Sequence, residues 1–328
     1  MKLGIVVVYL VAEEDERLLE IHLSQIEKTT SVPFRIYAAA NRLSPRLREK
    51  IESLPCVSIC QFPTTPLRGS SEHAYYLDRL VEIAVADGAT CICTFHVDSF
   101  PVCSGWAEKV TAKLRGDCVL AGVARDERKD RKPSTEFMMF TREFYVEHRP
   151  TFLLTESEMA SFEYQRYLVS CPHYYPDSGV GYGFKVWAQG LSWFPLLRVD
   201  RDRERDREYY VTGAVYENLI FHLGGTVQDR RLREDLSSYQ ARAVMRLLSM
   251  ARALGSAVVP SKFWRRVNRI TAIQRLAEAY WARPRRVHVF LETRNALLAD
   301  PEQLLHWLRD RPQGEAEASR DPKSESIT

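Results

Sequence analysis

The sequence predicts an α/β protein: a mostly parallel sheet with helices on both faces, followed by a helical C-terminal extension. Three observations lead to this prediction. Strand-like and helix-like segments alternate through the first half of the chain. The first strand-like run is apolar throughout, as in strands that are covered on both faces. The 328 residues are also enough for one large α/β domain or two small ones.

The first half contains five predicted strands with helices between them. Residues 5–11 form a continuous β-branched run, and residues 13–28 carry apolar residues at helical spacing with acids in the first turn. Pro45 opens a short helix and Gly88 ends a longer one. This order predicts parallel strands joined by helical crossovers. The predicted strands are 5–11, 34–40, 57–62, 90–95 and 118–124, and the predicted helices are 13–28, 45–54, 70–87 and 106–114.

The regular alternation of predicted strands and helices ends after residue 124. The sequence predicts a first domain over residues 1–230, a helical extension over 231–312 and a disordered polar tail over 313–328. Within these parts we expect a charged loop at 125–133, a strand at 136–144, mixed structure at 145–176, a helix at 178–189, a solvated charge run at 198–207 and a long helix at 232–254.

Charge and cysteine usage narrow the class of protein. The net charge of only +3 argues against a nucleic-acid binder, which usually has a strongly basic face. The seven cysteines include no CxxC pair and several lie in apolar runs, which is typical of reduced core residues. The apolar run near the N-terminus is short and ends in acids, as a first buried strand does. We therefore expect a cytoplasmic protein, with the inner membrane surface as a second possible location.

The clearest site signal is ThrPheHisValAspSerPhePro at residues 94–101, where a predicted strand ends in a histidine and an aspartate. Side chains two apart on a strand point to the same side, so His96 and Asp98 should aim at one point. That point lies beyond the carboxyl end of the strand, where open α/β sheets bind their ligands. An imidazole with a carboxylate suits a divalent metal such as Mn²⁺, whereas oxygen ligands alone favour Mg²⁺. The alternative is structural: Asp98 caps the next turn and His96 bonds to backbone.

This segment resembles the DxD region of GT-A glycosyltransferases, in which a strand ends in an acidic pair and often continues to Phe-Pro. The resemblance implies that Asp98, at the second acidic position, is a direct metal ligand. His96 falls on the first position, whose acid usually contacts the ribose or a metal-bound water, so it is a cofactor-binding candidate. A histidine there departs from the family pattern.

The segment at residues 69–78 opens the helix before the DxD-like strand, where family members often carry a donor-contacting residue. His73 and Asp78 are the candidates on this helix. A surface or capping role is the alternative for His73. Tyr9 and Asn41 are further cofactor-binding candidates.

Two later segments complete the resemblance. Residues 175–190 resemble the part of the family that holds the acceptor-side acid, which implies that Asp177 is the general base of an inverting enzyme. A plain N-cap before the next helix is the alternative. In PheHisLeuGlyGlyThr, residues 221–226, His222 resembles the late histidine that completes the metal site or touches the pyrophosphate. The glycines after it allow backbone to approach a phosphate, although a lone histidine is often structural.

The resemblance covers roughly residues 1–230 and implies a metal-dependent, hexosyltransferase-like enzyme. Such an enzyme would use Mn²⁺ or Mg²⁺ to move a sugar from a nucleotide-diphosphate donor, in this family often a UDP-sugar, to a hydroxyl of a glycan, a lipid-linked acceptor or a small molecule. Two alternatives stay open: an inactive GT-A-fold nucleotide-sugar binding protein, and a nucleotidyltransferase on a similar sheet. Against the second, residues 5–15 hold no glycine for a phosphate loop.

A basic amphipathic stretch occupies residues 261–286, with eight basic side chains against one acid, Glu278, and four interleaved aromatic side chains. Such a stretch can lie on an anionic membrane surface, which would suit a lipid-carried acceptor. The alternative is that its aromatic side chains pack on the rest of the protein while the arginines face water.

Overall fold

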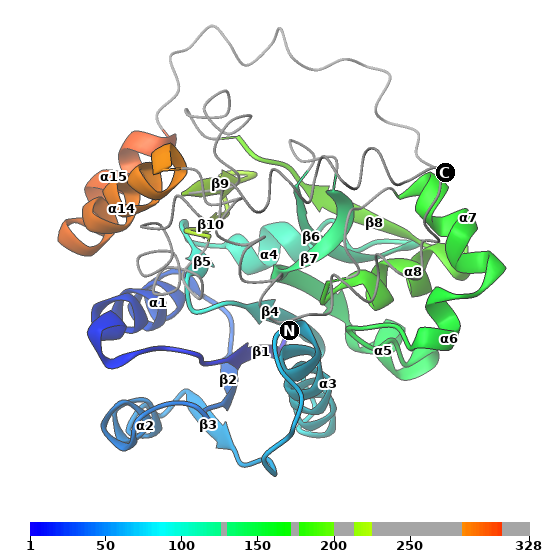
Figure 1. Ribbon diagram of the computed structural model, residues 1–328, viewed down its shortest axis with the longest axis horizontal. Helices are drawn as coiled ribbons and strands as arrows, with labels where there is room; N and C mark the ends of the chain where they lie inside the picture. Colours follow the sequence, from blue (N-terminus) through cyan, green and yellow to red (C-terminus); the bar gives the residue numbers. More distant parts are fainter. Residues whose placement is uncertain (126–129, 172–176, 200–212, 225–283, 310–328) are drawn as a thin grey trace, which may run out of the picture.

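The computed structural model describes residues 1–125, 130–171, 177–199, 213–224 and 284–309 (Figure 1). Several predictions fall outside these ranges: the helix at 232–254, nearly all of the basic stretch at 261–286, most of the charge run at 198–207 and the tail at 313–328. They stay predictions.

The main sheet has seven strands in the order β3-β2-β1-β4-β7-β6-β8. All neighbouring strands are parallel except at β7, which is antiparallel to both β4 and β6. The mostly parallel sheet predicted from the sequence is therefore confirmed. Its strands are β1 (Leu3–Val8), β2 (Phe34–Ala39), β3 (Val57–Cys60), β4 (Cys91–Phe95), β6 (Cys118–Arg125), β7 (Asp130–Thr141) and β8 (Ser192–Leu196).

Helices cover both faces of this sheet because each strand alternates apolar side chains between two cores. In β1, Ile5 packs with one set of helices and Val6 with the other. The first set is α1 (Glu16–Thr29), α2 (Pro45–Glu52) and α4 (Trp106–Thr111). The second is α3 (Ser70–Ala86), α5 (Arg142–His148) and α8 (Val180–Ala188), and α6 (Glu156–Met159) and α7 (Phe162–Ser170) lie beside α8 in Figure 1.

The predicted charged loop at 125–133 is wrong in its extent. Strand β6 runs to Arg125, and β7 starts at Asp130, which pairs with it. The polar residues of this region suggested exposure to solvent, but the side chains of 132–136 are buried. The next strand ends earlier than predicted, at Thr141, whose hydroxyl accepts a hydrogen bond from Phe144 N and caps α5.

A second, three-stranded sheet lies next to the carboxyl end of β4 and was not predicted. Its order is β5 (Ser99–Pro101), β10 (Ile220–His222) and β9 (Ala214–Tyr216), all antiparallel. The turn between β9 and β10 has positive φ at both Glu217 (50°) and Asn218 (54°), as in the tight hairpin turns that match strand twist. This hairpin carries His222 back toward the main sheet.

The C-terminal helices α14 (Pro284–Ala299) and α15 (Pro301–Arg309) pack beside α1 and the small sheet (Figure 1). Phe221 of β10 and Leu297 of α14 share one core there, and both are fully buried. Arg294 pairs with Asp15 at the start of α1. No helix among the described residues has the length and apolar character that crossing a bilayer requires.

If α14 is part of the core behind β10, then Leu297→Ala should lower the free energy of unfolding by about 2–5 kcal/mol, because it leaves a cavity among apolar side chains. Val169→Ala removes methyl groups from a side chain that is 85% exposed, so it should change stability by less than about 0.5 kcal/mol. Denaturant unfolding of both variants checks this. Equal effects would mean that the C-terminal helices do not support the small sheet.

Candidate metal centre and active site

Three potential metal ligands meet where β4 ends: His96, Asp98 and His222. One ligand atom from each lies within 4.8 Å of the others, and His222 Nε2 is 3.7 Å from Asp98 Oδ1. Two ligands of one ion, each at about 2.0–2.2 Å from it, are at most about 4.4 Å apart, so this group can close around an ion with a small side-chain adjustment.

The antiparallel pairing of β5 with β10 creates this group. It sets His222 opposite Ser99, and Leu223 N donates a hydrogen bond to Asp98 O at 2.8 Å. His96 and Asp98 come together for a different reason than the sequence suggested. They do not alternate on a strand, because β4 ends at Phe95 and both lie in the turn before β5.

The turn itself is held by Ser99 and His22. His96 N donates to Ser99 Oγ at 2.8 Å, and Ser99 Oγ donates to Glu136 O at 2.5 Å. His22 Nδ1 donates to Ser99 O at 2.9 Å from within α1. Burial lowers the pKa of His22 to about 4, so it is a neutral donor. His22 was not predicted as a site residue, because it lies in an otherwise ordinary amphipathic helix.

His222 is suited to binding a metal because it is buried and neutral. Burial lowers its pKa, although the nearby charge of Asp98 opposes the shift. Its Nδ1 has no hydrogen-bond partner among the described residues. A neutral imidazole with a nitrogen facing Asp98 is the form that ligates metal ions.

His96 belongs to a chain of side-chain contacts that leads to α3 and α8. Its Nε2 is 3.2 Å from Thr135 Oγ1, which is 3.0 Å from Ser178 Oγ. Ser178 Oγ is in turn 3.3 Å from His73 Nδ1, and the rings of His73 and His96 stand edge to face with centroids 5.0 Å apart. Burial lowers the pKa of His73 to about 3. Helix α3 therefore brings His73 next to His96, and a donor contact by His73 stays a prediction.

A buried ion pair lies under the candidate metal group. Glu136 is fully buried and accepts two hydrogen bonds from Arg125, at 2.6 and 2.8 Å. Burial alone would raise the pKa of Glu136, but Arg125, and then His222, hold it well below its usual value. This pair was not predicted, because Arg125 falls in a charged segment that resembles a loop. A lone glutamate in an apolar strand was the available signal.

Asp177 lies three residues before the start of α8 and is hydrogen-bonded to Ser178, which belongs to the chain of contacts from His96. Its Oδ1 accepts hydrogen bonds from Ser70 Oγ at 2.5 Å and from Ser178 N at 2.8 Å. Burial would raise its pKa, but the charge of Lys132 and these hydrogen bonds lower it, so Asp177 is ionised. It is not the N-cap of α8, which is Gly179.

The other three predicted site residues lie elsewhere. Asp78 accepts a hydrogen bond from Phe152 N at 3.0 Å, and burial raises its pKa to about 7. Tyr9 is fully buried in the core, and burial raises the pKa of its phenol. Asn41 is exposed just after β2 and donates to Phe62 O at 2.9 Å. The structure does not bring these three to the candidate metal group.

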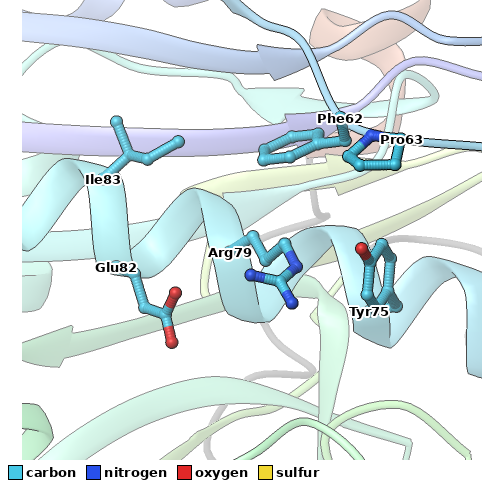
Figure 2. Close-up of a pocket in the computed structure, with 6 residues that line it drawn as sticks. All are labelled: Phe62, Pro63, Tyr75, Arg79, Glu82 and Ile83. Carbon is cyan, nitrogen blue, oxygen red and sulfur yellow. The ribbon is translucent and has the colours of Figure 1, made fainter.

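A separate hollow of about 300 Å³ opens beside α3 (Figure 2). The guanidinium of Arg79 lies over the ring of Tyr75, 4.8 Å from its centroid. None of the predicted site residues lines it. Its lining is Phe62, Pro63, Tyr75, Arg79, Glu82 and Ile83.

Comparison with known proteins gives similarity only at the level of the fold. No protein-family model matches the chain, and no curated protein matches it. Among solved structures, the apo form of the bifunctional glycosyltransferase WbbM aligns at 12% identity and a TM-score of 0.33, over 45% of this chain and only 33% of that one. Mouse xyloside xylosyltransferase 1, also apo, aligns at 10% identity and a TM-score of 0.35, over 60% of this chain and 85% of that one. At such low scores the function has to be judged from the site itself.

The Arg125–Glu136 pair should be essential to the fold around the site. Arg125→Met leaves a buried carboxylate uncompensated, so it should lower the free energy of unfolding by about 3–5 kcal/mol. Arg17→Met breaks an exposed pair with Glu20 and should cost less than about 1 kcal/mol. Thermal and denaturant unfolding check this, and an Arg125→Met protein as stable as Arg17→Met would contradict the ion pair.

Proposed function

We propose that this chain is a metal-dependent glycosyltransferase that moves a sugar from a nucleotide-diphosphate donor to an acceptor hydroxyl. The observation that carries the proposal is the group formed by His96, Asp98 and His222 at the end of β4. It lies at the edge where open α/β sheets bind their ligands. The nucleotide is expected to be UDP, by resemblance to GT-A enzymes.

The ligand set fits a divalent transition metal. Two imidazoles and one carboxylate favour Mn²⁺ over Mg²⁺, which prefers oxygen ligands. The buried side chain of His222, whose Nε2 lies 3.7 Å from Asp98 Oδ1, supports the fit. With a divalent cation bound, the site supplies positive charge for the diphosphate that leaves as the glycosidic bond breaks.

The surrounding residues keep the ligands in position. His22 and Ser99 hold the turn that carries His96 and Asp98, and Thr135 contacts His96 directly. Residues that orient metal ligands in this way commonly affect metal affinity as strongly as ten- to a hundredfold. His73, edge to face with His96, is our candidate for a donor contact from α3.

Asp177 is our candidate for the base that accepts the acceptor proton if the reaction inverts the sugar configuration. It is ionised, and both hydrogen bonds donated to it by described residues end on Oδ1. Oδ2 is therefore the oxygen we assign to the acceptor hydroxyl. Ser70 and Ser178 fix the orientation of the carboxylate by holding its other oxygen.

The acceptor is proposed to be a glycan, a lipid-linked sugar or a small molecule. An acceptor on a lipid would make use of the basic stretch at 261–286. Sedimentation with anionic liposomes at low and moderate salt tests that part. A nucleotide-sugar binding protein without activity would bind UDP and Mn²⁺ but would neither transfer nor hydrolyse a UDP-sugar.

Replacing a metal ligand should abolish metal binding and transfer while the fold survives. For Asp98→Ala and His222→Ala we expect Mn²⁺ affinity to fall at least about tenfold and turnover of UDP-sugars to drop below about a tenth of wild type. Titration with Mn²⁺ and a UDP-sugar hydrolysis assay measure both effects. His306→Ala, an exposed histidine on α15, is the matched control and should leave both unchanged. Variants that bind Mn²⁺ as the wild type does would exclude the proposed site.

Asp177→Asn should separate chemistry from donor binding. The amide keeps the shape of the carboxylate but cannot accept the proton, so kcat should fall by roughly 10²–10⁴-fold while the Kd for UDP with Mn²⁺ stays within about threefold. Steady-state kinetics and calorimetry give the two values. A loss of UDP affinity with an unchanged kcat would place Asp177 on the donor side instead.

A further inference from the structure

Lys132 is a buried cation that the proposed function does not yet use. Its side chain is only 2% exposed. Among the residues that the structure describes, none makes a hydrogen bond to Lys132, and no carboxylate oxygen lies within 4.0 Å of its nitrogen. Lysines are rarely buried without a partner, because an uncompensated charge in the interior is costly.

The backbone places Lys132 beside Asp177. The next residue, Pro133, lies against the start of α8 so closely that a Cβ on Gly179 would come within 2.5 Å of Pro133 O. Gly179 is two residues after Asp177, and the charge of Lys132 is the largest influence that lowers the pKa of Asp177 against burial. The two charges therefore interact across more than 4.0 Å without forming an ion pair.

The other groups nearby already have partners. Glu136 lies four residues further along β7, and its carboxylate accepts hydrogen bonds from Arg125 and Ser134. Asp177 is held by Ser70 and Ser178 N. Among the described residues, the carboxylate of Glu136 therefore pairs with Arg125 of β6, whereas no carboxylate forms an ion pair with Lys132 of β7.

We propose that Lys132 binds an anionic oxygen of the substrate, next to the carboxylate of Asp177. The anion would be the diphosphate of the donor or an acidic group on the sugar or the acceptor, since a lysine ammonium pairs with phosphate and carboxylate alike. The identity of the substrate rests on the proposed function, whereas the anion site itself is a property of Lys132. Among the described residues the Lys132 ammonium has no hydrogen-bond or ion-pair partner, so a bound anion would offset the cost of its burial.

Lys132→Met removes the charge and keeps most of the volume. We expect the variant without ligand to fold, since removing an unpaired buried ammonium offsets the loss of the positive charge that keeps Asp177 ionised. It should also bind anions roughly thirtyfold or more weakly. The probes are pyrophosphate and glucuronate, each with and without Mn²⁺, followed by thermal shift and calorimetry. Lys109→Met, at an exposed lysine on α4, is the matched control.

The two probes distinguish the source of the anion. Lost binding of pyrophosphate assigns Lys132 to the diphosphate, and lost binding of glucuronate assigns it to an acidic sugar or acceptor. Wild-type protein that binds neither anion, or Lys132→Met protein that binds both as well as wild type, overturns the proposal.

A purely structural role gives a different result. If Lys132 only balances Asp177, then Lys132→Met lowers stability, the added substitution Asp177→Asn restores it, and both variants bind anions as well as wild type, which would also overturn the proposal. Anion binding that depends on Lys132 in a protein without UDP-sugar turnover would contradict the proposed function and leave this anion site in place.

Discussion

The site depends on the antiparallel pairing of β5 with β10. This pairing sets His222 opposite Ser99 and ties Leu223 N to Asp98 O, so that two segments more than a hundred residues apart offer ligands to one point. The rest of the fold supports it from both sides. Strand β4 of the main sheet leads into the turn that carries His96 and Asp98, and α14 packs in the core behind β10. Without the pairing, the turn would carry His96 and Asp98 alone, which is too few protein ligands for a firmly held ion.

The buried groups around this point differ in charge: the histidines are neutral and the carboxylates are ionised. The histidines at 22, 73 and 222 all have a lowered pKa because desolvation disfavours the imidazolium. The carboxylates of Glu136 and Asp177 stay ionised despite burial, because Arg125 and Lys132 supply positive charge. Neutral imidazoles beside ionised carboxylates are the state in which a metal ion can be held at neutral pH. The Arg125–Glu136 pair also joins β6 to β7.

The sequence predicted the parts of this arrangement that follow from local pattern. The sheet and its flanking helices could be predicted from alternating strand and helix signals, and Asp98 with His222 from resemblance to GT-A motifs. His96 was found for the wrong reason, since it lies in a turn and not on a strand. The roles of Arg125 and Lys132 could not be predicted, because the charged residues at 125–133 resemble a solvated loop. The partner that holds Glu136 is Arg125 on the neighbouring strand, a pairing between β6 and β7 that a local pattern does not contain.

The account depends most directly on where a metal ion binds. Anomalous diffraction from crystals of the wild-type chain soaked in Mn²⁺ would locate it, with data collected at the manganese absorption edge. The account predicts a single strong peak within coordinating distance of His96, Asp98 and His222. A peak elsewhere, or none at this point in crystals that bind Mn²⁺, would contradict it.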